Sequence, residues 1–413
     1  MKYKLSIVCS CMLLVACSTN NDSGWVMPGL NQQHPDIINP NPNPNPNPNP
    51  NPNPNPGNNI PDNGNNVPSG NLPGNGNIDN NQISNEQIQK LLTLIKANGE
   101  NFWGKDEFVN LSRYTYVKYF DHYSTRSVIN FEKNKITIAT VSNNDIDDKL
   151  KKAIVSTLLM PADPNLVHIF TDNDIELSGA GDPLLLGQVK DQDNQDVHWE
   201  WRANRFADYL LDNKLQTKQF SKGTIHYVEI NMVDDSESVR EYKYSDLARA
   251  ASAKYGIDER LIYAIIKTES SFNPFAVSNA GAYGLMQIIP KTAGADVFSL
   301  VKHIDGQPSK EYLFDPTNNI DTGTAYFTIL RDRYLKAVIN PLSQHYSMIS
   351  AYNGGTGGVL STYDSDRSVA MEKLNQQTPE QVYQTLTHEH PKEEARHYLE
   401  KVTNFEKEFD QLD

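Results

Sequence analysis

The residue of this sequence with the clearest capacity for chemistry is a glutamate at the end of an apolar helical pattern. Asp258 is placed to cap the start of this helix, and apolar residues recur along one of its faces. Glu269 falls seven residues after Ile262 and four after Ile265, so it continues the buried face. No arginine or lysine lies one turn away along that face, so desolvation is expected to raise the pKa of the carboxyl group. A carboxyl group that holds its proton near neutral pH meets the requirement for a general acid.

Short motifs follow this glutamate in a fixed order. Pro274 ends the helix, and Gly281 and Gly284 mark tight turns or close approaches of the backbone. The motifs are Glu269-Ser270, Asn273-Pro274, Ser278, Gly284-Leu285-Met286-Gln287, Ala351-Tyr352-Asn353 and a late Tyr398. As an ordered set they resemble the lytic transglycosylases of the goose-type lysozyme superfamily.

This resemblance implies a peptidoglycan-cleaving enzyme that needs no cofactor or metal and acts on glycan strands. Glu269 is expected to protonate the oxygen between N-acetylmuramic acid and N-acetylglucosamine, and then, as a carboxylate, to take a proton from the C6 hydroxyl of the muramic residue. The product would be a 1,6-anhydro sugar. Ser278 and Gln287 are expected to bind the sugar, while Tyr352, Asn353 and Tyr398 line the same groove, with Tyr398 hydrogen-bonded to Glu269.

Two further observations bear on the reaction and on its substrate. No carboxylate stands at a motif position to act beside Glu269, whereas ordinary glycoside hydrolysis uses two, and this favours the anhydro-forming route over hydrolysis. Val359-Leu360-Ser361 stands where the family often has a basic residue after its Tyr-Asn-Gly-Gly segment. The alternatives are a hydrolytic muramidase of the same fold and a non-catalytic tether that binds peptidoglycan.

The helical patterns around this site predict a mainly α, lysozyme-like domain over residues 238–413. Residues 85–237 predict an α+β companion domain, with a first helix, a strand from Tyr114 to Phe120, and a hairpin over residues 128–141 that turns at Glu132 to Lys135. Segments 103–105, 116–119 and 127–138 resemble the amino-terminal domain of membrane-bound members of the same family. That domain is non-catalytic, so the resemblance assigns no role to its residues.

The first 17 residues resemble a bacterial lipoprotein signal peptide. Lys2 and Lys4 precede an apolar run that is too short to span a bilayer and ends in Leu14-Val15-Ala16-Cys17. Lipidation of Cys17 would anchor the protein to a membrane. Since Ser18 rather than aspartate follows, we expect the periplasmic face of the outer membrane of a Gram-negative bacterium. A plain signal peptide with an incidental cysteine is the alternative.

Residues 18–84 predict a disordered linker, because they are rich in asparagine, proline and glycine and cannot form a core. The linker contains nine consecutive Asn-Pro pairs from Asn39 to Pro56. In polyproline geometry this stretch alone would reach roughly 55 Å. Repeat expansion without a selected length is the alternative to a tether of fixed reach.

Charge and composition exclude other classes of function. The formal net charge of −14 and the lack of a basic stripe argue against a nucleic-acid partner. All three cysteines lie within the first 17 residues, so no disulfide is expected in the mature protein. The aspartate clusters around residues 174 and 193 lack the spacing of a calcium-binding EF-hand loop, and the histidines at 388–397 lack that of a helical zinc pair.

Overall fold

The computed structural model describes residues 85–167, 172, 175 and 181–409. The predicted signal peptide, Cys17 and the linker over residues 18–84 lie outside the described residues. The described residues belong to one compact unit. Among the described residues, no helix combines the length and apolar character that crossing a bilayer would require.

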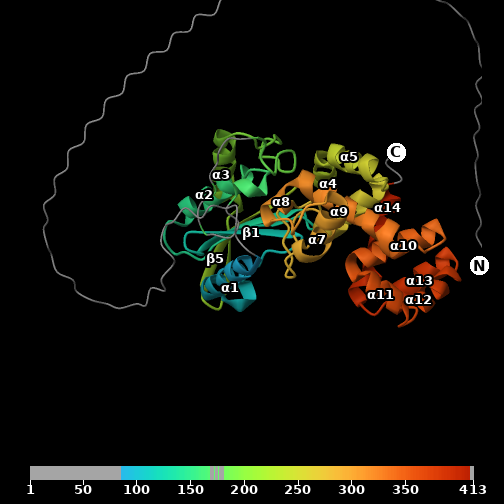
Figure 1. Cartoon of the computed structure of the whole chain (residues 1–413). Coiled ribbons are helices and arrows are strands. Elements are labelled where there is room, and N and C mark those ends of the chain that lie inside the picture. Colours follow the sequence, from blue (N-terminus) through green and yellow to red (C-terminus); the bar gives the residue numbers. More distant parts are fainter. Residues whose placement is uncertain (1–84, 168–171, 173–174, 176–180, 410–413) are drawn as a thin grey trace, which may run out of the picture. The chain divides into compact units, whose positions relative to one another are not determined.

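An antiparallel sheet with helices on both faces makes up the first half of this unit (Figure 1). Its elements are α1 (Asn85–Glu107), β1 (Thr115–Phe120), β2 (Thr125–Asn130), β3 (Lys135–Thr140), α2 (Ile146–Leu158), a 3₁₀ turn (Pro164–Leu166), α3 (Glu200–Lys214), β4 (Gln216–Phe220) and β5 (Gly223–Asn231). The five strands lie in the order β1-β2-β3-β5-β4. The α+β architecture expected from the sequence is confirmed.

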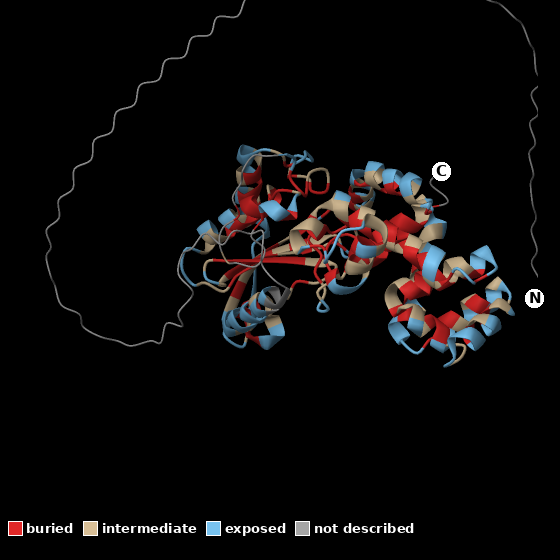
Figure 2. Ribbon diagram, in the orientation of Figure 1, coloured by how far each residue is buried: buried red, intermediate tan, exposed pale blue. Residues whose placement is uncertain are grey.

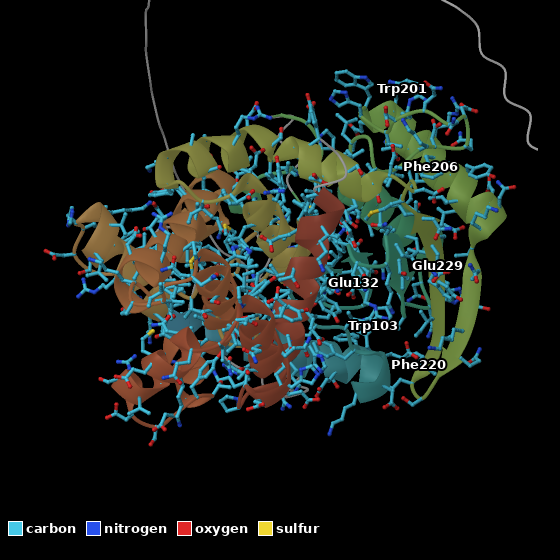
Figure 3. The ribbon with its side chains drawn as sticks, turned by 90° about the vertical axis from the view of Figure 1, so that its right-hand side faces the viewer. Trp103, Glu132, Trp201, Phe206, Phe220 and Glu229 are labelled. Carbon is cyan, nitrogen blue, oxygen red and sulfur yellow. The ribbon has the colours of Figure 1, made fainter. Side chains whose placement is uncertain are left out.

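Alternating side chains of β2 show which helices cover each face of the sheet. Ser127 forms a 2.5 Å hydrogen bond with Thr157 of α2, so this face packs against α2. Arg126 points the opposite way and lies 3.8 Å from the ring centre of Trp103 in α1. Trp103 is fully buried beneath the sheet (Figure 3). The sheet is therefore covered by helices on both faces.

The predicted hairpin is present, and its turn covers residues 131–134, one residue earlier than expected. Strands β2 and β3 pair Ile129 with Ile136 and Ser127 with Ile138, and Phe131 lies in the turn. The sequence patterns did not indicate β4, whose side chains are nearly all exposed and polar. A polar edge strand lacks the apolar alternation from which a strand is predicted.

The second half is helical. It comprises α4 (Ser236–Lys243), α5 (Ser245–Tyr255), α6 (Glu259–Ser270), π-helical turns (Pro290–Gly294, Phe298–Lys302, Leu330–Tyr334), α7 (Ala295–Val297), α8 (Lys310–Phe314), α9 (Pro316–Ile329), α10 (Pro341–Gly354), α11 (Thr356–Ser361), α12 (Arg367–Asn375), α13 (Pro379–Glu389) and α14 (Glu393–Phe409). Leu261 to Ile266 are buried along helix α6. Buried residues gather along the strands of the sheet and on the inner sides of the helices (Figure 2). This half has the mainly helical arrangement that the sequence predicted.

The two halves are joined by contacts at the start of β1. The hydroxyl of Tyr114 donates a 2.6 Å hydrogen bond to the carbonyl of Thr268 near the end of α6. The ring of Tyr116 packs edge-on against Phe275, with ring centres 5.0 Å apart. Both Tyr116 and Phe275 are fully buried. The companion domain is thus docked directly beside the end of the helix that carries Glu269.

Candidate active site

Helix α6 fixes the position of Glu269. It begins where the side chain of Asp258 accepts a 2.9 Å hydrogen bond from the backbone N–H of Arg260, as the sequence predicted. It ends at Ser271, whose left-handed conformation (φ 50°) stops the helix directly after Glu269 and Ser270. Only 5% of Glu269 is exposed. The carboxyl group therefore sits at a helix end and is largely shielded from solvent.

Two side chains hold the two oxygens of this carboxyl group. The hydroxyl of Tyr398 donates a 2.8 Å hydrogen bond to Oε1 of Glu269, and Nη1 of Arg113 lies 3.2 Å from Oε2. Burial raises the pKa of Glu269, while the charge of Arg113 and the hydrogen bonds from Tyr398 and Arg113 lower it. Burial is the largest of these effects, so the pKa stays above its ordinary value. The raised pKa and the hydrogen bond from Tyr398 agree with the expectation from sequence.

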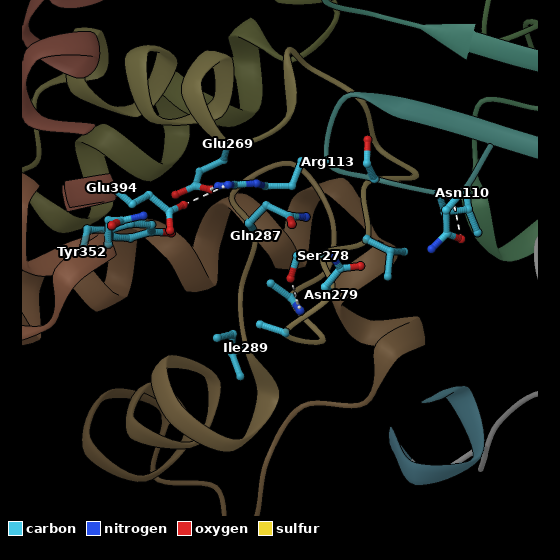
Figure 4. A pocket seen from close by; sticks show the side chains of 15 residues that line it. Asn110, Arg113, Glu269, Ser278, Asn279, Gln287, Ile289, Tyr352 and Glu394 are labelled. Carbon is cyan, nitrogen blue, oxygen red and sulfur yellow. Dashed lines mark hydrogen bonds and ion pairs between the residues drawn. The ribbon is translucent and has the colours of Figure 1, made fainter. Parts of the chain in front are cut away.

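Arg113 and Glu394 were not identified from the sequence. Arg113 precedes β1 in the companion domain, and its Nη2 also lies 2.9 Å from Oε1 of Glu394, in the first turn of α14. One guanidinium thus bridges two carboxylates (Figure 4). Glu394 supplies a second carboxylate in the cleft, which the motif comparison lacked. Neither residue belongs to a motif or an apolar pattern, so only their position in the fold reveals them.

A loop after α6 presents Ser278 and Gln287 to the same cleft. Oγ of Ser278 accepts a 3.0 Å hydrogen bond from the backbone N–H of Ala282. The amide nitrogen of Gln287 donates to the carbonyls of Ala276 and Gly284, at 3.2 and 3.0 Å. Its amide oxygen is buried and has no hydrogen-bond partner among the described residues. The loop therefore places the hydroxyl of Ser278 and a buried, unpartnered acceptor of Gln287 at the wall of the cleft.

Gly284 explains why this loop needs a glycine. Its φ of +73° is unfavourable for other residues, and a Cβ atom there would lie 2.5 Å from the carbonyl oxygen of Leu313. The side-chain amide of Asn319 also donates to the carbonyls of Tyr283 and Leu313, at 2.8 and 2.7 Å. The turn is thereby pressed against α9, which fixes the direction of the following Gln287.

Tyr352 and Asn353, near the end of α10, also line the cleft. The ring of Tyr352 stacks on Phe327 at 4.7 Å, and its hydroxyl donates a 2.9 Å hydrogen bond to the carbonyl of Met286. Burial raises the pKa of Tyr352 well above its usual value. Tyr352 therefore links helices α9 and α10 to the loop that carries Gln287.

These groups line one open cleft with a volume of about 590 Å³. The structure brings Glu269, Ser278, Gln287, Tyr352 and Asn353 together around it, whereas Tyr398 lies behind Glu269 and is almost fully buried. The complete lining is Asn110, Leu111, Ser112, Arg113, Glu269, Val277, Ser278, Asn279, Ala280, Ala282, Gln287, Ile289, Tyr352, Asn353 and Glu394. The companion domain thus supplies four consecutive residues of the cleft.

A buried acid at a helix end, facing an open polar cleft within a helical domain, defines a lysozyme-like glycosidic-bond-cleaving protein. Residues 80–243 match the family model described as membrane-bound lytic murein transglycosylase C, N-terminal domain. Residues 246–375 match the transglycosylase SLT domain.

Curated relatives called membrane-bound lytic murein transglycosylase C match most of the chain. The protein from Photorhabdus laumondii is 50% identical over 77% of this chain and 88% of its own. The protein from Serratia proteamaculans is 49% identical with the same coverage, and that from Yersinia pestis is 46% identical over 80% of this chain and 93% of its own. The chain belongs to the membrane-bound lytic murein transglycosylase C family.

Proposed function

We propose that this protein is a peptidoglycan lytic transglycosylase in which Glu269 serves first as acid and then as base. Protonated Glu269 gives its proton to the glycosidic oxygen of the bond between N-acetylmuramic acid and N-acetylglucosamine. The bond to the anomeric carbon breaks, and the C6 hydroxyl oxygen of the muramic residue attacks that carbon. The Glu269 carboxylate takes the hydroxyl proton, which restores the acid and gives a 1,6-anhydro end without consuming water.

The observation that carries this proposal is the burial of Glu269 at the wall of the cleft. Burial keeps a proton on the carboxyl group at higher pH than in water, as the first step needs. The hydrogen bond from Tyr398 stabilises the carboxylate that forms once the proton has left. Burial raises the pKa of Tyr398 well above its usual value, so this hydroxyl remains a donor throughout. The same glutamate can thus act in both steps.

Ser278 and Gln287 are suited to the acetamido group of the sugar. Because Oγ of Ser278 already accepts a hydrogen bond, its hydroxyl proton is left to be donated to a carbonyl oxygen. The amide oxygen of Gln287 has no partner among the described residues and is buried at the wall of the cleft, so it would accept an N–H of the sugar once the side chain turns toward the cleft. A donor and an acceptor on one wall complement the C=O and N–H of an N-acetyl group. Tyr352 and Asn353 would line the remaining groove beside it.

A hydrolytic muramidase is the second candidate, because Glu394 places another carboxylate in the cleft. Glu394 is 64% exposed in its side chain and lacks the burial of Glu269. The two reactions differ in their products, which makes them separable. Digestion of purified sacculi in ¹⁸O-water followed by mass spectrometry should give anhydro ends, lighter by one water and free of ¹⁸O. Reducing ends carrying ¹⁸O would identify a muramidase instead.

Two variants test which of the two carboxylates takes part in proton transfer. Glu269→Gln should release no muropeptides, because glutamine cannot donate and recover the proton. Glu394→Gln should still give anhydro ends, since Glu394 takes no part in either proton transfer. Product release by Glu269→Gln at the wild-type rate would refute the role of Glu269, and absence of release by the wild type would leave only the peptidoglycan-binding tether.

Membrane attachment through Cys17 is part of the proposal. The curated relatives are named membrane-bound, and the lipoprotein pattern before Cys17 is the feature that could anchor this chain. We infer a signal peptide over residues 1–17, a linker over 18–84, a companion domain over 85–237 and a catalytic domain over 238–413. Fractionation should find the full-length protein in the outer membrane and a Cys17→Ser variant outside it. Equal membrane recovery of both proteins would exclude the lipid anchor.

A further inference from the structure

Arg113 partly offsets the rise in the pKa of Glu269 that burial causes, and this opposes the first proton transfer. Its guanidinium lies 3.2 Å from Oε2 of Glu269 and thereby favours the charged carboxylate. A general acid at that position must carry a proton. The second step, by contrast, begins from the carboxylate. The ion pair therefore suits the resting enzyme better than the enzyme that is about to cleave a glycan strand.

We propose that Arg113 is a recognition and positioning residue that changes partner when substrate binds. In the free enzyme it bridges Glu269 and Glu394, and in the complex it turns to a carboxylate of the glycan strand, leaving Glu269 to carry the proton. This inference rests on the proposed transglycosylase function and adds a substrate requirement to it.

The contacts of Arg113 fix its backbone and leave its head group accessible. The side-chain amide of Asn273 donates a 3.1 Å hydrogen bond to the carbonyl of Arg113, and the next residue, Tyr114, is bound to Thr268. The side chain of Arg113 is nevertheless 31% exposed, and that of its partner Glu394 is 64% exposed. Because its backbone is fixed and its side chain is long, Arg113 can exchange one carboxylate partner for another without movement of either domain.

The charge of the cleft favours an anionic group as the new partner. Among the described residues that line the cleft, Arg113 is the only cation. Peptidoglycan carries carboxylates on its stem peptides, and the lactyl group of muramic acid is a carboxylate once its peptide has been removed. The segment Val359-Leu360-Ser361 lacks the basic residue that members of the resembled family often have there. Arg113 provides from the companion domain the positive charge that this segment does not.

Among the groups around Glu269, Arg113 is the one whose departure favours the protonated acid. The titratable groups that interact with Glu269 are Arg113, Tyr114, Tyr352, Glu394 and Tyr398. Burial raises the pKa of all three tyrosines, so they remain neutral where a carboxyl group titrates. Departure of Arg113 from Glu269 removes the only positive charge from this set, which favours the protonated acid.

Steady-state cleavage of three kinds of soluble strand tests the proposal. Strands of equal length carry intact stem peptides, or only the lactyl carboxylate after amidase treatment, or carboxylates converted to neutral methylamides. Arg113→Gln should raise KM about tenfold for whichever anionic strand supplies the carboxylate, and less than twofold for the methylamidated strand. Arg113→Lys should recover part of the loss. Arg249→Gln serves as the control, because Arg249 is paired with Asp246 and does not line the cleft.

The pH profiles separate partner exchange from a structural role. The profile of kcat/KM reports on the free enzyme, and that of kcat reports on the complex. In the wild type the descending limb of kcat/KM should lie at lower pH than that of kcat. In Arg113→Gln the kcat/KM limb should move up to meet the kcat limb, which stays in place. Equal movement of both limbs, or equal loss on all three strands, would overturn the proposal while leaving the transglycosylase function intact.

A second variant covers the case in which Arg113→Gln folds poorly. Glu394→Gln removes a competitor for Arg113, so KM for the anionic strand should fall. Combined with Arg113→Gln, the same change should have no such effect, because the cation that benefits is gone. A decrease in KM that persists in the double variant would show that Glu394 merely repels the substrate, and the exchange of partners would be wrong.

Discussion

The hydrogen bond between Tyr398 and Glu269 gives the most informative single test of the proton-transfer scheme. Tyr398→Phe removes a donor 2.8 Å from Oε1 of Glu269 and leaves the ring in place. Both residues are almost fully buried, so solvent does not replace the lost bond. A hydrogen bond to a charged group contributes ~1.5–3 kcal/mol. This is the amount by which the carboxylate form of Glu269 would lose stabilisation.

Two kinetic quantities should respond. The carboxylate that develops during glycosidic cleavage is less stable, so kcat should fall by up to about 100-fold. The proton on Glu269 is also held to higher pH, so the descending limb of kcat/KM should move upward by about one to two pH units. A variant that only disturbs packing would lower the rate without moving the limb.

The assay is release of anhydromuropeptides from soluble strands between pH 4 and 9. Tyr383→Phe is the matched control, because its hydroxyl lies 3.5 Å from Thr403 of α14 and does not contact Glu269. That variant should keep both the rate and the limb. An unmoved limb in Tyr398→Phe, or an identical shift in Tyr383→Phe, would refute the claim that Tyr398 stabilises the carboxylate.

Three further predictions concern stability, binding and domain docking. The raised pKa of Glu269 means that its charged form is costly in the folded state, so folding stability is lost as pH rises from the ordinary pKa through the raised one. Glu269→Gln should therefore raise Tm more at pH 7.5 than at pH 4. A gain in Tm that is independent of pH would contradict this. In the Glu269→Gln background, Ser278→Ala should weaken the binding of acetylated strands about 2- to 10-fold and leave the binding of N-deacetylated strands unchanged, as measured by calorimetry. Equal weakening for both kinds of strand would exclude recognition of the acetamido group by Ser278. Tyr114→Phe should lower the free energy of unfolding in urea by about 1 kcal/mol by removing the bond to Thr268; unchanged stability would show that this bond does not hold the domains together.

Much of the fold follows from local patterns in the sequence. The apolar spacing before Glu269 predicted α6 and its cap, because burial of one helix face leaves a clear period. The alternation around Ile129 and Ile136 predicted the central hairpin for the same reason. Strand β4 was missed because an exposed edge carries no such period. Patterns of burial thus predicted the elements that form the core and did not predict the exposed edge strand.

The candidate site was predictable where its residues belong to motifs, and not where they come from elsewhere. The positions of Ser278, Gln287 and Tyr352 around Glu269 agree with the ordered motifs. Arg113 lies 156 residues before Glu269 in the chain and precedes a strand of another domain. Glu394 lies in the first turn of α14, in a charged stretch that resembles an ordinary solvated helix start. Contacts of this kind depend on how the two domains dock, which local spacing does not specify.

The docking of the companion domain bears directly on the acid. The helical domain carries Glu269 at the end of α6 and supplies the hydrogen bond from Tyr398. The companion domain adds Arg113, the one cation of the described cleft, which lowers the pKa that burial has raised. Two opposing effects on one carboxyl group thus come from two domains. A domain without motif residues therefore influences when the acid is protonated, and through Arg113 it makes that protonation responsive to the charge of the bound strand.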